Sequence, residues 1–409
     1  MIEQHVLPNG LTLLGESRPG AKSVSVGFFV KTGSRDEAPD VAGVSHFLEH
    51  MCFKGTPRRS AADVNREFDE LGATYNAFTG EEYTVYYGTV LAEHRAALTD
   101  LLADMMRPSL RADDFDVEKK VILQEIALYK DRPRPWLLWE VARPLFYAGH
   151  PLGNSVLGSD ESIAALTVEA MRAYHHARYS PHNLALVVTG AYDWRGVIAG
   201  AEQLCGRWTG PETTRKLTPV GARGLVKTVR ADRFDRAHVA FFSPAPSAQD
   251  PRRFAAEVLA EVAGGGEGSR LYWALEEPGL AETASLSFDP ADAAGAWIGY
   301  LSGDPEHAPD LTTRYRTVLD QLTREGVSAD EVARNARKLA AARVLQGEAS
   351  FRRMVDVGFD WMYGRRRESI DETADRLLAV TDREVNALLD ERPFDSLTVV
   401  ATGPLDTLT

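Results

Sequence analysis

Cysteine is scarce in this sequence, and long apolar runs are missing. Only Cys52 and Cys205 occur among the 409 residues, which excludes a disulfide framework and argues against a metal site built from cysteines. No apolar run reaches the length of about 18 residues that a transmembrane helix needs. The N-terminus lacks a basic segment followed by an apolar one, so we expect no signal peptide, no membrane association and a cytoplasmic location.

Positive charge is also in deficit. Lysine and arginine together number 46, against 59 aspartate and glutamate residues, and the formal net charge is −13. Binding to nucleic acid needs clustered basic side chains, so no nucleic-acid partner is expected. The hydrophobic share of 44% and the charged share of 26% are typical of a globular protein, and 409 residues suggest two or three domains.

Strand-like and helix-like segments alternate along the chain. Residues 24–30 and 184–189 are rich in β-branched and other apolar side chains, which predicts buried strands. Residues 41–53 have an apolar helical face, and Ser45 lies early enough in this stretch to assist an N-cap. Residues 114–129 also predict a helix.

The two halves of the chain share a weak repeat. The segment 239–242 echoes 26–29, and the helix predicted over 252–265 echoes the one that starts near Val41. In this repeat, the first half carries a polar cluster where the second half has mainly apolar residues. We therefore expect two similar domains, of which only the first keeps the polar cluster.

A polar stretch with Pro and Gly lies between these halves, at 210–224. This is the composition of an interdomain linker. The boundaries that we predict are 1–212 for the first domain, 213–224 for the linker and 225–409 for the second domain.

The polar cluster is His46-Phe47-Leu48-Glu49-His50. Positions i and i+4 of a helix share one face, so both imidazoles can reach one metal ion. Glu49 points somewhat aside, which suits a carboxylate that takes a proton from water better than one that binds metal. The order is that of the inverted zincins, H-x-x-E-H. Because chance would produce the motif in roughly two of a hundred chains of this composition, alone it is only suggestive.

A catalytic zinc site needs a third protein ligand and one open position. The predicted helix at 114–129 offers Glu118 and Glu125, which lie two turns apart on one face. Glu125 lies in the apolar run VILQEIAL, where a carboxylate is costly unless it is paired or bound to metal. From the pattern alone, an exposed position on an amphipathic helix is an equally good interpretation of Glu125, and Glu118 is more typical of a solvated charge.

Several segments, taken in order, resemble the pitrilysin and mitochondrial-processing-peptidase family of zinc metallopeptidases. They cover nearly the whole chain and are GVSHFLEHMCFKGT, GATYNAFTGEEYTVYY, VILQEIALYKDRP, GHPLGNSVLG, RYSPHNLALVVTG and GGGEGSRLYWAL. The resemblance implies an α+β fold with two similar α/β-roll domains, each a mixed sheet with helices packed on one face, that form half of a clamshell. It also implies one Zn²⁺ per chain and the hydrolysis of unfolded peptides.

The same resemblance assigns roles to the polar residues. It implies that His46, His50 and Glu125 are the zinc ligands and that Glu49 is the general base. Glu118 matches the family's second acidic position on its helix, and we count it with Glu49 among the catalytic residues because it would support the site from behind the ligands.

Asn76, Ala77 and Phe78 match the substrate-binding edge strand of the family. An exposed sheet edge offers N–H and C=O groups with which an extended peptide can pair. Without the resemblance, an ordinary strand end would be the better interpretation of these residues.

The second half departs from the family pattern. Active relatives usually carry an Arg and a Tyr that stabilise the reacting carbonyl, and this chain has Glu276 and Glu282 at about those positions. The chain could be inactive, could use other residues, or could obtain the Arg and Tyr from a different subunit. We favour a heterodimer with a paralogous subunit; the alternatives are a self-sufficient homodimeric peptidase and a non-catalytic structural subunit.

Overall fold

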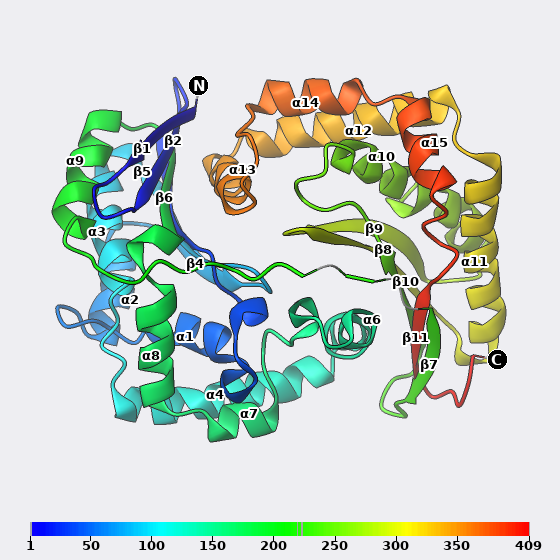
Figure 1. Ribbon diagram of the computed structural model, residues 1–409, viewed down its shortest axis with the longest axis horizontal. Coiled ribbons are helices and arrows are strands. Elements are labelled where there is room, and N and C mark those ends of the chain that lie inside the picture. The colour runs from blue at the N-terminus through cyan, green and yellow to red at the C-terminus, as the bar shows by residue number, and fades with distance from the viewer. Residues whose placement is uncertain (1, 219, 222–223, 409) are drawn as a thin grey trace. The chain divides into compact units, whose positions relative to one another are not determined.

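The computed structural model describes residues 2–218, 220–221 and 224–408. The chain forms two compact units, and Figure 1 labels most of their helices and strands. Unit 1 comprises Met1–Ile126, Asn154–Lys216 and Leu345–Ser369, and unit 2 comprises Ala127–Gly153, Leu217–Val344 and Ile370–Thr409. The predicted linker includes residues 219, 222 and 223, which lie outside the described residues, and the boundaries at 212 and 225 stay a prediction.

Unit 1 is built on a six-stranded mixed sheet. Its strands are β1 (Ile2–Val6), β2 (Thr12–Ser17), β3 (Ser23–Val30), β4 (Thr74–Thr79), β5 (Thr84–Leu91) and β6 (Leu184–Gly190). Their order is β1-β2-β6-β3-β5-β4, with β2 parallel to β6 and the other pairs antiparallel. The main helices are α1 (Val44–Cys52), α2 (Ala61–Glu70), α3 (Arg95–Met105), α4 (Ala112–Lys130), α7 (Asp160–Ala165), α8 (Val168–Arg178), α9 (Trp194–Cys205) and α13 (Ser350–Met362).

Unit 2 is built on a five-stranded sheet of the order β7-β11-β8-β10-β9. Its strands are β7 (Leu225–Arg230), β8 (Ala237–Pro244), β9 (Thr283–Ala291), β10 (Ala294–Gly303) and β11 (Thr398–Gly403). The helical segments are α5 (Pro133–Pro135), η4 (Trp136–Ala142), α6 (Arg143–Tyr147), α10 (Arg253–Gly264), η7 (Tyr272–Glu276), α11 (Ala308–Glu325), α12 (Ala329–Gly347, which continues into unit 1), α14 (Ile370–Leu378) and α15 (Asp382–Asp390).

The two sheets have matching topology. In each, the parallel pair (β2 with β6, β7 with β11) is followed by three antiparallel neighbours, and among the strands of the described residues only β1 lacks a counterpart. The prediction of two similar α+β units is therefore confirmed. The match also explains the sequence repeat, because segments 26–29 and 239–242 lie in the equivalent strands β3 and β8.

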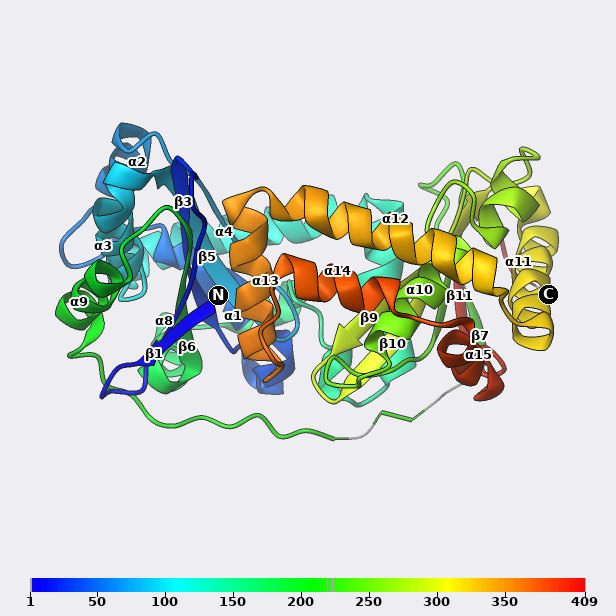
Figure 2. The ribbon, with the colours of Figure 1, turned by 90° about the horizontal axis from the view of Figure 1, so that it is seen from above.

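Helical segments cover both faces of each sheet, which corrects the expectation of helices packed on one face. Segments distant in sequence, α13 in unit 1 and η4 with α6 in unit 2, cover the second face. In unit 1, Gly88 of β5 faces α3, because a Cβ atom added to this glycine would lie 2.8 Å from Leu98. The preceding residue, Tyr87, faces α13, where its ring contacts Phe351. Because successive strand residues point to opposite faces, α3 and α13 lie on different sides of the sheet. On its outer side α3 lies beside α9, as Figure 2 shows.

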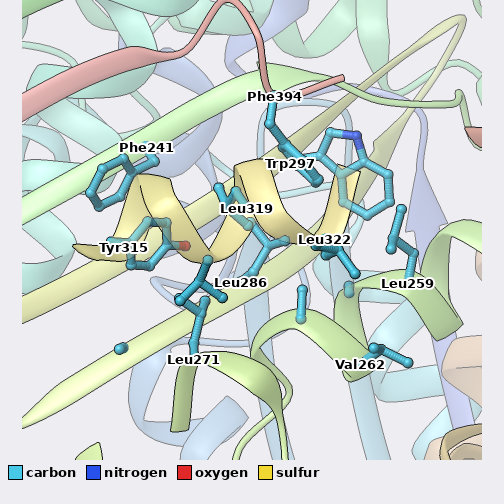
Figure 3. Close-up of a cluster of buried hydrophobic side chains, with 14 of the residues drawn as sticks. Phe241, Leu259, Val262, Leu271, Leu286, Trp297, Tyr315, Leu319, Leu322 and Phe394 are labelled. Atoms are coloured by element: carbon cyan, nitrogen blue, oxygen red, sulfur yellow. The ribbon is translucent and has the colours of Figure 1, made fainter. Parts of the chain in front are cut away.

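The core of unit 2 follows the same alternation. Phe241 of β8 belongs to a large cluster between the sheet and α10 and α11, where its ring stacks on Tyr315 at 4.0 Å between centroids (Figure 3). The next residue, Phe242, points to the other face, into a smaller cluster with Phe146 of α6. Burial of large apolar side chains on both faces supplies the main stabilisation of such a sheet.

Candidate metal centre

The helix α1 starts at an unusual N-terminus. Gly43 occupies the N-cap position with a φ of 88°, a left-handed conformation that glycine adopts without strain. The buried Glu37 carboxylate accepts the backbone N–H groups of Gly43 and Ser45, each at 2.7 Å. Burial raises the pKa of Glu37 to about 7 in spite of these hydrogen bonds. The prediction that Ser45 assists the N-cap is wrong, because its hydroxyl instead bonds the Tyr174 hydroxyl at 2.6 Å.

Two imidazoles and one carboxylate converge on one point of unit 1. His46 and His50 share a face of α1, and Glu125 projects toward them from α4. The Nε2 atom of His46 lies 3.6 Å from one Glu125 oxygen, and the Nε2 atom of His50 lies 3.5 Å from the other. One donor atom from each residue falls within 4.8 Å of the others, and in the described part of the chain this is the group found with metal-binding geometry.

The two histidines differ in protonation. Burial lowers the pKa of His46 to about 3, so its ring is neutral near pH 7. Burial lowers the pKa of His50, but its hydrogen bond to Glu118 and the nearby carboxylates outweigh burial and raise that pKa above its usual value. The Nδ1 atom of His50 lies 2.9 Å from Glu118, a geometry in which Nδ1–H donates and Nε2 keeps its lone pair. Two imidazole nitrogens and a carboxylate oxygen are a donor set that Zn²⁺ accepts, and the residues present therefore fit this metal.

Glu118 is held between two cationic or hydrogen-bonding partners. One of its oxygens accepts from His50, and the other lies 2.6 Å from Nζ of Lys54. Burial works against ionisation, but these two partners lower the pKa of Glu118, so it is a carboxylate at neutral pH. A carboxylate behind a ligating histidine fixes the tautomer and orientation of that ring.

Glu49 lies beside the triad without belonging to it. Its side chain is buried, and the Thr79 hydroxyl donates to Oε2 at 2.5 Å. Burial raises the pKa of this carboxyl, which brings it closer to the value that proton transfer near neutral pH requires.

The strand β4 is an edge of its sheet and pairs with β5. Asn76 is exposed, Ala77 is buried and Phe78 is half-buried, so the three predicted residues alternate across this strand. Thr79, the final residue of β4, lies next to them and reaches Glu49.

Sequence reasoning missed three residues around this centre. Lys54 lies four positions after His50, just beyond the end of α1, and this closeness in sequence could have indicated it. Glu37 and Thr79 reach α1 from a loop and from a strand, and no local spacing connects them with the motif.

Unit 2 carries no equivalent donor set at the matching helix. Val258 and Val262 of α10 are buried, and Glu261 is paired with Lys338 at 2.6 Å. Glu276 accepts the backbone N–H of Ala284 at 2.6 Å, and Glu282 is paired with Arg236 at 2.6 Å. Both carboxylates at the expected Arg and Tyr positions thus have partners within their own unit.

The paired units, with an H-x-x-E-H helix in the first and none in the second, define the class of inverted-zincin peptidase folds. Comparison with known proteins identifies the family. Residues 12–160 match the model "Insulinase (Peptidase family M16)", and residues 165–339 match "Peptidase M16 inactive domain". The chain belongs to this insulinase family of peptidases, which confirms the resemblance.

Relatives and solved structures agree with this assignment. An uncharacterized zinc protease of Mycobacterium tuberculosis is 35% identical over 93% of this chain and 88% of its own length. The zinc protease YmxG of Bacillus subtilis is 29% identical over 95% of both chains. A protease from Helicobacter pylori has a TM-score of 0.91 at 19% identity, covering 99% of both chains, which shows a shared fold.

None of the helices in the described parts of the chain has the length and apolar character that crossing a membrane requires.

Proposed function

We propose that this protein is a zinc-dependent endopeptidase that hydrolyses peptide bonds in unfolded peptides. The observation that carries the proposal is the convergence of His46, His50 and Glu125 around one point, with Glu49 beside them. Zn²⁺ held by the three ligands would supply Lewis acidity at the scissile carbonyl and at the attacking water. One ion per chain matches the donor set found in the described part of the chain.

Glu49 is the residue that moves protons in this proposal. Its raised pKa and its place beside the ligands suit a base that takes the proton of the attacking water. The same carboxyl then delivers that proton to the leaving amine, so the overall hydrolysis is balanced. Glu118 acts indirectly, because it holds the His50 ring.

The peptide would bind as an added strand along β4. An edge strand presents unpaired N–H and C=O groups, and pairing with them selects an extended backbone more than a particular sequence. Asn76, Ala77 and Phe78 lie on the part of β4 that would pair with such a peptide, and the Ala77 N–H, now donated to Oδ1 of Asn76 at 2.9 Å, would exchange that acceptor for a peptide carbonyl. This mode supports unfolded peptides as the substrate class.

The working enzyme is proposed to be a heterodimer. Glu276 and Glu282 are acidic where active relatives place an Arg and a Tyr, and a carboxylate cannot stabilise a developing oxyanion. Within unit 2, Glu276 accepts the Ala284 N–H and Glu282 is paired with Arg236. A paralogous subunit with the Arg and Tyr would complete the site.

The test combines metal analysis with a matched pair of variants. Purified protein should contain about one zinc per chain, and Glu49→Gln should retain zinc while losing about 10²- to 10⁴-fold in peptide cleavage. Glu93→Gln, an exposed change of the same chemistry, should keep the wild-type rate. A protein without zinc would contradict the proposal and favour a non-catalytic structural subunit.

The partner is tested separately. Peptide cleavage should be weak for the isolated chain and should rise when the product of a paralogous gene is added. Full activity of the isolated chain would reject the heterodimer and favour the self-sufficient homodimer, while leaving the zinc peptidase intact.

A further inference from the structure

The hydroxyl of Thr79 forms a short hydrogen bond with the proposed base. It donates to Oε2 of Glu49 at 2.5 Å, and the two residues come from different elements, β4 and α1. With Oε2 held by this bond, rotation of the carboxylate about its last torsion is restricted. A hydrogen bond to one carboxylate oxygen therefore fixes which way the other one points.

The backbone that carries Thr79 is docked against a preceding loop. The carbonyl of Gly80 accepts the N–H of Ser34 at 3.3 Å, and the carbonyl of Glu81 accepts the N–H of Arg35 at 2.7 Å. The approach is close: a Cβ added to Gly33 would lie 2.1 Å from the Gly80 oxygen. The chain just after Thr79 therefore has little room to move.

A buried ion-pair network also holds the turn between β4 and β5, which follows Thr79. Arg35 and Glu82 are paired at 2.5 Å, and their side chains are 1% and 4% exposed. Arg215 adds a contact to Glu82 at 3.3 Å and pairs with Asp36 at 2.7 Å. Because breaking a buried pair leaves an uncompensated charge, such a network resists displacement.

We propose that Thr79 is a positioning residue that fixes the Glu49 carboxylate and ties it to the end of the peptide-binding strand. The inference rests on the proposed function. A peptide paired along β4 and a base held by the last residue of β4 share one rigid frame, so the scissile bond and the base keep their relative distance. Misplacement of a reacting group by about 1 Å can cost about 100-fold in rate.

The experiment compares two substitutions of Thr79 in whichever assembly cleaves peptide. Thr79→Val keeps the shape but removes the donor, and we expect kcat to fall about 10- to 100-fold with KM nearly unchanged. Thr79→Ser keeps the donor and should restore most of kcat. Thr89→Val is the matched control, because it removes a hydroxyl bonded to Ser25 at 2.7 Å in the same sheet and should leave kcat unchanged.

Two further measurements separate positioning from structure. Zinc content should equal that of the wild type in each variant. In the inactive Glu49→Gln background, adding Thr79→Val should not change the dissociation constant of an uncleaved peptide. Should Thr79→Val not fold, Thr79→Ala and Thr79→Ser make the same comparison.

Defined outcomes overturn the inference. These are a wild-type kcat in Thr79→Val, an equal loss in Thr79→Ser, loss of zinc, or an equal loss in the Thr89 control. A wild-type protein that cleaves no peptide in any assembly would instead refute the proposed function, so the two failures are distinguishable.

Discussion

The Nδ1 atom of His50 lies 2.9 Å from Oε1 of Glu118, and this contact orients the ring toward the metal-binding point. Replacing Glu118 with Ala removes the acceptor, so we expect zinc affinity to fall about 10- to 100-fold. Competition with a chromophoric chelator measures the affinity. Asp116→Asn, an exposed change on the same helix, is the control. If Glu118→Ala binds zinc as tightly as the wild type, the contact between Glu118 and His50 does not affect metal binding.

Removal of the metal should destabilise unit 1. A ligand present at about 100 times its dissociation constant stabilises the folded state by about 2.7 kcal/mol, which corresponds to several degrees in Tm. Calorimetry with and without a chelator should therefore show a lower Tm for the wild type after chelation. His50→Ala should show little response to the chelator, and an equal shift in both proteins would contradict this ligand assignment.

Arg215 should stabilise unit 1 although it lies in the predicted linker. Its guanidinium binds Asp36, whose side chain is 3% exposed and which is also paired with Arg178. Arg215→Ala leaves Arg178 as the remaining arginine on this buried carboxylate, so we expect a loss of about 2 kcal/mol in the free energy of unfolding. Denaturant titration measures it.

The control for that variant is Arg66→Ala, which breaks an exposed pair with Asp63. Exposed pairs contribute little, so its unfolding should match the wild type. An equal free energy of unfolding for the two variants would mean that the Arg215 contact contributes no more stability than an exposed ion pair.

His175 should make the protein sensitive to acid. Burial lowers the pKa of His175 from 6.5 to about 4, and its Nε2 lies 3.0 Å from the Met106 carbonyl. Between pH 6.5 and about pH 4, His175 binds a proton in the unfolded state but not in the folded state. The stability of the folded state therefore falls as the pH drops through this range.

The variant His175→Gln keeps an N–H donor for Met106 and removes this titration. Over that range, the wild type should lose about 3 kcal/mol more than the variant. Zinc release affects both proteins equally, so the difference isolates His175. His176→Gln, a change at the exposed neighbouring position, should follow the wild type, and parallel curves for all three would refute the assignment.

Local patterns were sufficient for the elements and for part of the site. The apolar β3 and β6 and the helical face of α1 follow from residue type and spacing, and i, i+4 spacing puts His46 and His50 on one face. Glu125 could not be chosen from the pattern, because its approach to α1 depends on tertiary packing. Only the family resemblance selected it.

Long-range contacts explain the rest of what the sequence did not show. Thr79 reaches Glu49 across 30 positions, and Glu37, not Ser45, supplies the acceptor at the start of α1. α13 packs on β3 and β6 although it follows them by more than a hundred residues. No local pattern carries such information.

Each unit is made of three separate segments of the chain, so cutting the chain once between its two halves does not yield a complete unit. The chain passes from one unit to the other after residues 126, 153, 216, 344 and 369. A fragment that ends at residue 212 would lack α13 and would expose the apolar face that this helix covers on β2, β3 and β6. The two halves of the chain thus share a topology but are not separable modules, since each half supplies a segment that the other half needs for its core.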